Sequence, residues 1–311
     1  MTKSEPKVSI GIPVYNGQKY IARAIDCALD QTYSDFKLFI SDNASDDQTE
    51  DICRDYAKRD KRVIYMRQPK NLGAVPNFNH VFDVSDSEYY KWAAVDDLYD
   101  KSYLQKAVAI LDNNPDVVWC HSRTSHIDFA GRLLDVPDGV DVAYPERESE
   151  ITSTRFKSVL LGQGGCHDIY GLIRSAAIRQ TPGHIACYGS EKILIAELCL
   201  LGRYLEIPET LFLCGVVEEG SGNLSTAEEQ QAFVDARRPK STRNARLTTL
   251  NGYMSAIRRS APNTMEALRC RMVVLQWLFQ VSKWRSVLEK SLKGQGLGGG
   301  NIERIKQIQG K

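Results

Sequence analysis

The sequence predicts an α/β fold with a mostly parallel sheet, followed by a helical C-terminal segment. From Val8 to Cys120, short β-rich runs alternate with segments of helical spacing, an alternation typical of parallel sheets covered by helices on both faces. After Thr226 no strand-like run is seen, and only helical patterns remain. We therefore expect an α/β domain at residues 1–225 and a helical extension with a flexible tail at residues 226–311.

Four strand–helix pairs are expected in the first part of the chain. In the first helix, apolar residues recur at Ile21, Ala24, Ile25 and Ala28, which places them on one helical face. The polar run 41–47 favours a turn and a helix cap over either regular structure. The expected strands are Val8–Ile12, Phe36–Ile40, Arg62–Met66 and Tyr89–Val95, and the expected helices are Gln18–Leu29, Gln48–Arg59, Pro76–Phe82 and Ser102–Asn113.

The pattern is less regular after this point. A strand at Val117–Cys120 is followed by a hairpin at His126–Leu134, with its turn at Ala130–Gly131. Gly202 is expected to end a helix as its C′ residue. The remaining expected elements are helices at Ile151–Leu161, Ser190–Leu201 and Met265–Leu278, and strands at Ile169–Ile173, Tyr204–Ile207 and Leu211–Val217.

The composition excludes several classes of protein. A formal net charge of +1 over 311 residues argues against nucleic acid as the main partner, because binding the phosphate backbone requires a basic excess. The N-terminus lacks the apolar stretch of a signal peptide, and no run approaches the roughly 18 apolar residues of a membrane span. We expect a cytoplasmic protein, or one that is peripheral at the inner face of a membrane.

The cysteines and histidines do not predict a metal cluster. The 8 cysteines are scattered without a Cys-x-x-Cys pair, which favours reduced, mostly buried thiols. The five histidines show neither an i, i+4 pair nor a cysteine partner in sequence, so a structural zinc site is not expected.

Two adjacent carboxylates, Asp96 and Asp97, follow the apolar run Tyr89–Val95. The carboxyl end of a strand in an open α/β sheet is where such sheets bind ligands. A hard divalent cation relieves the repulsion between two carboxylates, and Mg²⁺ is commonly held by one or two carboxylates together with substrate oxygens. The pair therefore predicts a Mg²⁺ or Mn²⁺ site that serves a phosphate-bearing substrate. The alternative is a solvated turn or an N-cap of the next helix.

Five segments together carry a family resemblance. In order and spacing they resemble the family 2 glycosyltransferases with the GT-A fold, over about Lys7 to Ser225. The segments are VSIGIPVYN (Val8–Asn16), FISDNASD (Phe39–Asp46), NLGAVPNFN (Asn71–Asn79), YYKWAAVDDLY (Tyr89–Tyr99) and YGSEKILIAELCLLGR (Tyr188–Arg203).

The resemblance implies a role for particular residues. Asp96 belongs to the DXD-like motif that places the metal under the diphosphate, with Asp97 as a neighbour or second ligand. Many relatives carry a further Asp where this chain has Ala94, which leaves open which carboxylate touches the metal. Tyr15 would lie against the base, Asp42 would accept from a base N–H, and Glu191 matches the catalytic base. The implied nucleotide-binding residues are Ile12, Pro13, Val14, Tyr15, Asp42, Asn71, Gly73, Asn79, Val95 and Asp96.

Each of these residues also has a structural alternative. Glu191 suits the first turn of a helix, where the dipole favours a carboxylate. Asp42 suits an Asx-turn, and Tyr15 suits packing at the end of a strand. The implied reaction is an inverting transfer of a sugar from a nucleotide-diphospho sugar, with a UDP-sugar expected, to a hydroxyl of a glycan, lipid-linked or other glycoconjugate acceptor.

Two other functions remain open. A sugar nucleotidyltransferase would need a glycine-rich phosphate loop after the first strand, where this chain has the single glycine Gly17. A catalytically silent nucleotide-binding scaffold would not need both Asp96 and Glu191. In the C-terminal helices, basic residues mix with aromatic ones, which fits contact with a lipid surface, a homodimer, or packing on the main domain.

Overall fold

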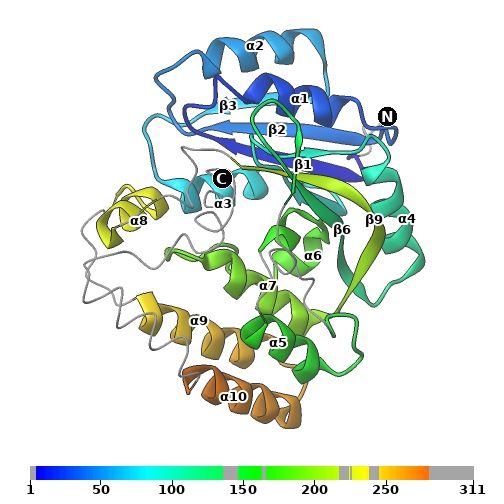
Figure 1. The fold of residues 1–311 in the computed structure, drawn as a ribbon, viewed down its shortest axis with the longest axis vertical. Helices are drawn as coiled ribbons and strands as arrows, with labels where there is room; N and C mark the ends of the chain where they lie inside the picture. The colour runs from blue at the N-terminus through cyan, green and yellow to red at the C-terminus, as the bar shows by residue number, and fades with distance from the viewer. Residues whose placement is uncertain are drawn as a thin grey trace.

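A computed structural model describes residues 5–135, 146–162, 166–216, 224, 226–237 and 245–279. Figure 1 shows a central sheet with α1 and α2 on one side, α3 on the other, and further helices stacked below it. The strands are β1 (Val8–Val14), β2 (Phe36–Asp42), β3 (Val63–Arg67), β4 (Tyr89–Trp92), β5 (Leu98–Tyr99), β6 (Val117–Ile127), β7 (Leu133–Leu134), β8 (Leu172–Arg174) and β9 (Arg203–Gly215).

The helices cover both faces of this sheet, which confirms the α/β fold class expected from the sequence. They are α1 (Ile21–Leu29), α2 (Thr49–Arg59), α3 (Ala74–Asp83), α4 (Tyr103–Asn113), α5 (Thr152–Leu161), the 3₁₀ helix η1 (His167–Tyr170), α6 (Ser175–Ile178), α7 (Ser190–Leu201), α8 (Ala227–Val234), α9 (Ala245–Ser260) and α10 (Thr264–Leu278).

The first four strands form the parallel part of the sheet. β1 lies in the middle and pairs in parallel with β2 and β4, and β2 pairs in parallel with β3. Gly11 of β1 accepts the Ala93 N–H, so Gly11 faces β4. Pro13, two residues later, faces the same side, but β4 has already ended at Trp92. Proline is therefore tolerated in β1, because its missing N–H leaves no gap in the pairing with β4. This early end of β4 corrects the expected strand Tyr89–Val95, and it frees Ala94 and Val95 to leave the sheet.

The segment that carries the carboxylates joins two strands that are not neighbours in the sheet. The strand order is β3-β2-β1-β4-β8-β6-β9-β5, with β7 paired to β6. β4 and β5 are therefore separated by three strands along the sheet, although only residues 93–97 join them in the chain. An extended link of this length would just span a flat sheet, and it places Asp96 and Asp97 between β4 and β5.

The second part of the sheet is built on a long parallel pair, β6 and β9. The two separate strands expected at Tyr204–Ile207 and Leu211–Val217 are one strand, and its register with β6 shifts between Ser122 and Thr124. The strand expected at Ile169–Ile173 is instead η1 followed by β8. The expected hairpin is confirmed, because His126 and Ile127 of β6 pair with Leu134 and Leu133 of β7.

Gly202 ends α7 in a way that differs from the expectation. Its φ is 178° and its ψ −170°, which is extended backbone and not the left-handed C′ conformation. A Cβ at this position would lie 2.3 Å from the Cγ2 atom of Val118 and 2.9 Å from the Asp116 carbonyl oxygen. Glycine is therefore explained by the close approach of β6.

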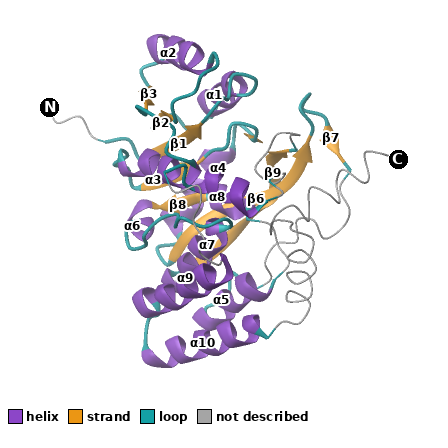
Figure 2. Cartoon of the chain, turned by 90° about the vertical axis from the view of Figure 1, so that its left-hand side faces the viewer, coloured by secondary structure: helices purple, strands orange, loops and turns teal. Residues whose placement is uncertain are grey.

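The C-terminal helices pack on the α/β part of the chain. α8 contacts α3, α9 contacts α7, and α10 contacts both α5 and α9. One hydrophobic cluster runs from Trp92 and Trp119 of the sheet to Tyr253 of α9 and Trp277 of α10. Figure 2 shows α5, α9 and α10 stacked at one end of the molecule, away from α1 and α2.

Two expectations for the C-terminal part concern residues that the structure does not describe. The domain boundary at Ser225 and the flexible tail beyond residue 279 both lie outside the described residues. Within the described part of the chain, no helix combines the length and the apolar character that a membrane span requires.

Candidate active site

A cavity of about 450 Å³ opens at the carboxyl ends of β1 and β4. Three loops, the segment before Asp97 and one C-terminal helix enclose it. Its lining residues are Pro13, Val14, Tyr15, Asn16, Gly17, Tyr20, Asn43, Asn71, Gly73, Ala74, Asn77, Phe78, Ala94, Val95, Asp96, Tyr170, Ala232 and Phe233.

The cavity gathers most, but not all, of the nucleotide-binding residues expected from the sequence. Those that line it are Pro13, Val14, Tyr15, Asn71, Gly73, Val95 and Asp96. Three others lie elsewhere: Ile12 is fully buried in the core, Asp42 is fully buried beside β3, and Asn79 exchanges hydrogen bonds of 2.8 and 2.9 Å with the backbone of His184.

The loops at the mouth of the cavity are joined by hydrogen bonds between polar side chains and backbone. The Asn16 N–H donates to Ser45 Oγ at 2.9 Å, and the Asp46 N–H donates to Asn16 Oδ1 at 3.0 Å. Asn43 Nδ2 donates to Asn71 Oδ1 at 2.9 Å and to the Gly73 carbonyl at 3.1 Å. These contacts explain why the polar run 41–47 forms a fixed turn.

Tyr15 and Asp42 differ in their access to solvent. The Tyr15 side chain lines the cavity and remains 48% exposed, so its ring is available to a planar ligand. Asp42 Oδ2 accepts from Tyr65 at 2.7 Å and from Arg67 at 3.0 Å, whereas Oδ1 accepts the Ser45 N–H at 2.8 Å. A carboxylate oxygen has two lone pairs, so Oδ1 keeps the capacity to accept one more hydrogen bond.

Asp96, which is partly buried, and Asp97, which is buried, form a carboxylate pair at the end of the cavity. Asp96 lines the cavity, and Asp97 Oδ1 accepts the Gly215 N–H at 2.9 Å. Burial, together with the neighbouring Asp97, raises the pKa of the Asp96 carboxyl to about 7, and burial likewise raises the pKa of Asp97. Two oxygen-donor groups whose negative charge is poorly compensated fit a hard divalent cation.

A buried lysine lies beneath this pair. Lys91 of β4 is fully buried, and its Nζ lies 4.7 Å from the ring centroid of Tyr99 and 4.8 Å from that of Tyr103. Burial lowers the pKa of this ammonium group to about 7. Lys91 Nζ also donates to the backbone carbonyl of Tyr170, which connects the core of the sheet to the wall of the cavity.

Glu191 lies in the first turn of α7. The preceding Gly189 has a φ of 77°, a left-handed conformation that favours glycine, and it turns the chain into the helix. Burial raises the pKa of the Glu191 carboxyl. Burial raises the pKa of the Tyr170 hydroxyl, and the nearby charges of Asp97, Asp96 and Glu191 raise it further.

Several lining residues were not found from the sequence. Asn43 and Asn77 stand inside or beside segments that carry the family resemblance, so their polarity beside a strand end was an available signal. Tyr170 comes from η1 and Phe233 from α8, far along the chain, and no local pattern marks either of them. Tyr170 stacks on Phe212, with ring centroids 6.0 Å apart and planes at 16°.

The fold groups histidine and cysteine side chains that are far apart in the sequence. The sequence shows no histidine with a cysteine partner, but the fold brings His126, His167 and Cys214 together, with their ligand atoms within 4.8 Å of one another. These residues come from β6, η1 and β9. The pairing arises from strand register across the sheet, which spacing along the chain does not reveal.

Comparisons with known proteins bear on this site. A family model described as Glycosyl transferase family 2 matches residues 9–178, a range that includes the carboxylate pair and ends before Glu191. An uncharacterized glycosyltransferase of Rickettsia typhi is 36% identical over 118 residues, which covers 37% of this chain and 36% of the relative. The chain spans between 36% and 46% of the length of this relative and the two that follow it in similarity.

Two solved structures share the fold. TarS of S. aureus (residues 1–349), in complex with UDP, matches with a TM-score of 0.60 and 16% identity, over 88% of this chain and 70% of TarS. The mannosyltransferase PcManGT of Pyrobaculum calidifontis, in complex with GDP-Man and Mn²⁺, matches with a TM-score of 0.54 and 13% identity, over 94% of this chain and 88% of PcManGT. Identities this low show the GT-A fold alone.

Proposed function

Because the chain belongs to glycosyl transferase family 2, we propose that it is an inverting, metal-dependent glycosyltransferase. It moves a sugar from a nucleotide-diphospho sugar to a hydroxyl of a glycan, lipid-linked or other glycoconjugate acceptor. The observation that carries this proposal is the cavity of about 450 Å³ with the partly buried Asp96 in its wall. A nucleoside fits between Tyr15 and the Asn43–Asn71 contact, with its diphosphate directed toward the carboxylates.

The proposed mechanism assigns one task to each group. Asp96, with Asp97 beside it, would hold Mn²⁺ or Mg²⁺, which when bound offsets the charge of the departing diphosphate as a Lewis acid. Glu191 takes the proton of the acceptor hydroxyl as a general base. Its raised pKa suits this task, because a base works best when its pKa lies near the operating pH. One base acting opposite the leaving group gives a single displacement, which inverts the anomeric carbon.

The UDP-sugar donor and the metal are supported by analogy. TarS binds UDP and PcManGT binds Mn²⁺ together with GDP-Man, and both share this fold. The nucleotidyltransferase alternative has less support, because the loop after β1 offers the single glycine Gly17 in the cavity wall. The silent scaffold is disfavoured because the chain has both Asp96 in the cavity wall and Glu191 in the first turn of α7, where its charge acts on Tyr170 of the cavity.

A thermal-shift screen of nucleotide sugars with and without Mn²⁺ tests the proposal. A ligand present at 100 times its Kd adds about 2.7 kcal/mol of apparent stability. We expect the largest rise in melting temperature with a UDP-sugar together with Mn²⁺. Without an acceptor, we expect slow hydrolysis of this donor, measured as free UDP. Stabilisation by a sugar phosphate with nucleoside triphosphate, and release of pyrophosphate, would support a nucleotidyltransferase instead. Stabilisation without any turnover would support the scaffold.

Asp42 is proposed to select the base. Its Oδ1 retains an acceptor lone pair, and a carboxylate accepts from a ring N–H but does not donate to one. In Asp42→Asn, Tyr65 and Arg67 hold the amide oxygen in place of Oδ2, so an NH2 group replaces Oδ1 and faces the base N–H. We expect this to weaken UDP binding by about 1–3 kcal/mol, the usual result of leaving a buried donor unpaired, while pyrophosphate binding is spared. Calorimetric titration of both ligands measures this difference.

Tyr65→Phe is the matched control for Asp42. It removes one structural hydrogen bond to the same carboxylate and leaves the carboxylate in place. The control should lower the melting temperature without changing the preference for UDP over pyrophosphate. If Asp42→Asn weakens both ligands equally, the role of Asp42 is confined to holding Tyr65 and Arg67.

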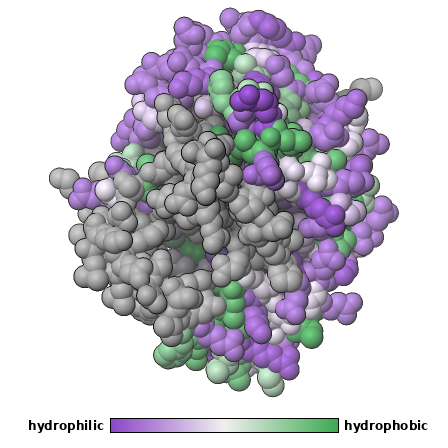
Figure 3. Space-filling view, in the orientation of Figure 1, coloured by the Kyte–Doolittle hydropathy of each residue, from purple (hydrophilic) through white to green (hydrophobic). Residues whose placement is uncertain are grey.

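The outer face of α10 is proposed to contact an anionic lipid surface. Five of its apolar side chains are 44–77% exposed and recur at alternating spacings of three and four residues: Met265, Leu268, Met272, Leu275 and Phe279. Figure 3 shows apolar residues along the lower edge of the molecule, where α10 lies. Arg269 and Arg271 flank this stripe and would repel their counterparts in a homodimer, whereas they attract anionic headgroups.

Vesicle sedimentation tests this surface. We expect binding to vesicles that contain anionic lipid, weaker binding at high salt, and a loss of binding in the Leu268→Glu, Leu275→Glu double variant. Leu133→Glu on β7 is the control, because Leu133 is 71% exposed at a distant site. A protein that is dimeric by light scattering and does not bind vesicles would show that the face belongs to a homodimer.

A further inference from the structure

A cluster of nitrogen and sulfur donors lies beside the carboxylate pair. His126 of β6 and Cys214 of β9 are direct register partners in the parallel β6–β9 pair, so the sheet itself holds their side chains next to each other. His167, the first residue of η1, approaches the same point, and its ring centroid lies 5.7 Å from that of His126. The ligand atoms of the three residues lie within 4.8 Å of one another.

We propose that His126, His167 and Cys214 form a binding site for a zinc-class cation, separate from the cation that accompanies the diphosphate. Imidazole and thiolate are the donor groups that Zn²⁺ prefers, whereas Mg²⁺ and Mn²⁺ prefer carboxylate and other oxygen donors. The two neighbouring clusters therefore differ in the class of metal that each selects. Three protein ligands leave a fourth position for solvent or for Asp97, whose carboxylate interacts with the Cys214 side chain.

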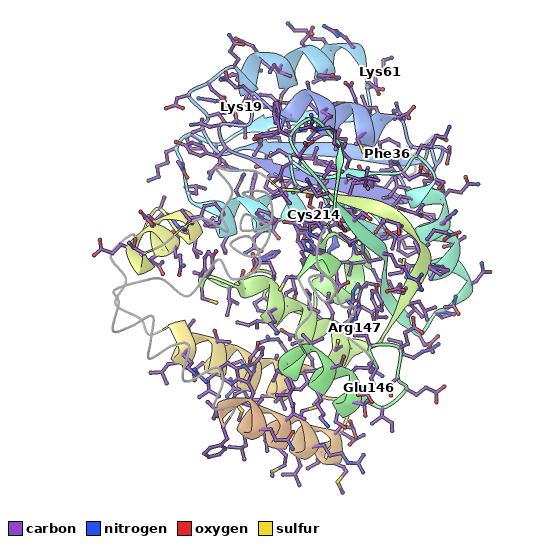
Figure 4. All side chains as sticks on the ribbon, in the orientation of Figure 1. Lys19, Phe36, Lys61, Glu146, Arg147 and Cys214 are labelled. Carbon is purple, nitrogen blue, oxygen red and sulfur yellow. The ribbon has the colours of Figure 1, made fainter. Side chains whose placement is uncertain are left out.

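The geometry requires only small side-chain adjustments. With Zn–N bonds of about 2.0–2.1 Å and Zn–S bonds of about 2.3 Å, the ligands of a tetrahedral ion lie roughly 3.3–3.8 Å apart. The ligand atoms are at present up to 4.8 Å apart. Rotations about the χ angles of His167 and Cys214, both of which are only partly buried, would bring them to the distances that a tetrahedral ion needs. Figure 4 shows Cys214 near the centre of the molecule, and Cys214 lies close to the end of β9, where this strand pairs with β6.

A cation at this site would tie η1 to the paired strands β6 and β9. His167 begins η1, and η1 ends at Tyr170, whose ring forms part of the cavity wall. Fixing His167 to the ends of β6 and β9 would therefore fix the position of Tyr170 in the cavity wall, which it shares with Asp96. The site acts as a structural support of the cavity and takes no part in the sugar transfer itself.

Cobalt is the probe for this site, because a Co²⁺–thiolate bond gives a charge-transfer band that oxygen ligands do not give. Reduced, metal-stripped protein is titrated with Co²⁺ without nucleotide. We expect one Co²⁺ per chain, with the thiolate band and tetrahedral visible bands, and displacement of both by Zn²⁺. Cys214→Ala should lose the thiolate band, and His167→Ala should lose the tetrahedral visible bands.

Two controls separate this site from other thiols and from the diphosphate cation. Cys270→Ala removes a buried thiol of α10, and Asp96→Ala removes the proposed ligand of the other cation. Both should keep the full cobalt spectrum. A wild-type protein without the thiolate band, a Cys214→Ala variant that retains it, or an Asp96→Ala variant that loses it would each overturn the proposal. The result does not depend on whether the protein transfers sugars.

Discussion

Glu191→Gln is expected to keep donor binding and thermal stability but to lower the rate of sugar transfer by 10²-fold or more, in line with the roughly 10²–10⁴-fold contribution of a general base. The substitution preserves the size of the side chain in the first turn of α7. It removes the group that takes a proton, because an amide is not basic at neutral pH. Single-turnover transfer and thermal melts on one preparation measure both quantities.

A purely structural role for Glu191 predicts the opposite outcome. A carboxylate in the first helical turn stabilises the helix dipole, so Glu191→Gln would then melt at a lower temperature and turn over normally per folded molecule. Glu209→Gln is a matched control, since Glu209 is an exposed carboxylate that pairs with Lys106 at the surface. Its transfer rate should equal that of the wild type. A destabilised but fully active Glu191→Gln would reject the assignment of the base.

Asp96→Ala is expected to uncouple nucleotide binding from the divalent cation. In the wild type, calorimetric titration with UDP should show tighter binding in Mn²⁺ than in EDTA, because the metal bridges the diphosphate and the carboxylates. In the variant, the two conditions should give the same weak affinity. The variant should not unfold, since removing one carboxylate of a buried pair relieves repulsion.

Asp86→Ala serves as the control for the metal experiment, because Asp86 has a side chain that is 88% exposed. It should retain the full difference between Mn²⁺ and EDTA. Equal UDP affinities in wild type and Asp96→Ala under both conditions would exclude the proposed metal bridge. Asp97→Asn, titrated in the same way, shows which of the two carboxylates contributes more to the coupling.

Local patterns predicted most of the fold correctly. β1 and β2 begin, and α7 both begins and ends, where apolar periodicity and flanking polar residues place them. The errors fall where tertiary contacts override local preference. β4 stops early because the chain must cross to β5, and β5 itself has two residues, too few to show any period. Gly202 was assigned to a helix cap, but it is required by the approach of Val118.

The candidate site was predictable only where its residues share a segment. Tyr15, Asn71 and Asp96 stand at strand ends or in recognisable motifs, so their positions beside the cavity follow from the order of the strands. Tyr170 and Phe233 reach the cavity through packing between distant elements. The adjacency of His126 and Cys214 depends on a strand register that includes a β-bulge, and nothing in the local sequence specifies such a register.

The short link between β4 and β5 has a consequence for how products leave. Residues 93–97 connect β4 to β5, which lie in different parts of the sheet. A hinge motion that separated these two parts would therefore displace Asp96 and Asp97. Under the proposed function, exit of the spent nucleotide is therefore expected to be a local event at the cavity, whose wall includes Ala232 and Phe233 of the C-terminal helix α8. In many enzymes product release limits the overall rate. If release of the nucleotide is limiting here, replacing Phe233 with a smaller side chain will raise the turnover rate, whereas making the sheet more rigid will leave the turnover rate unchanged.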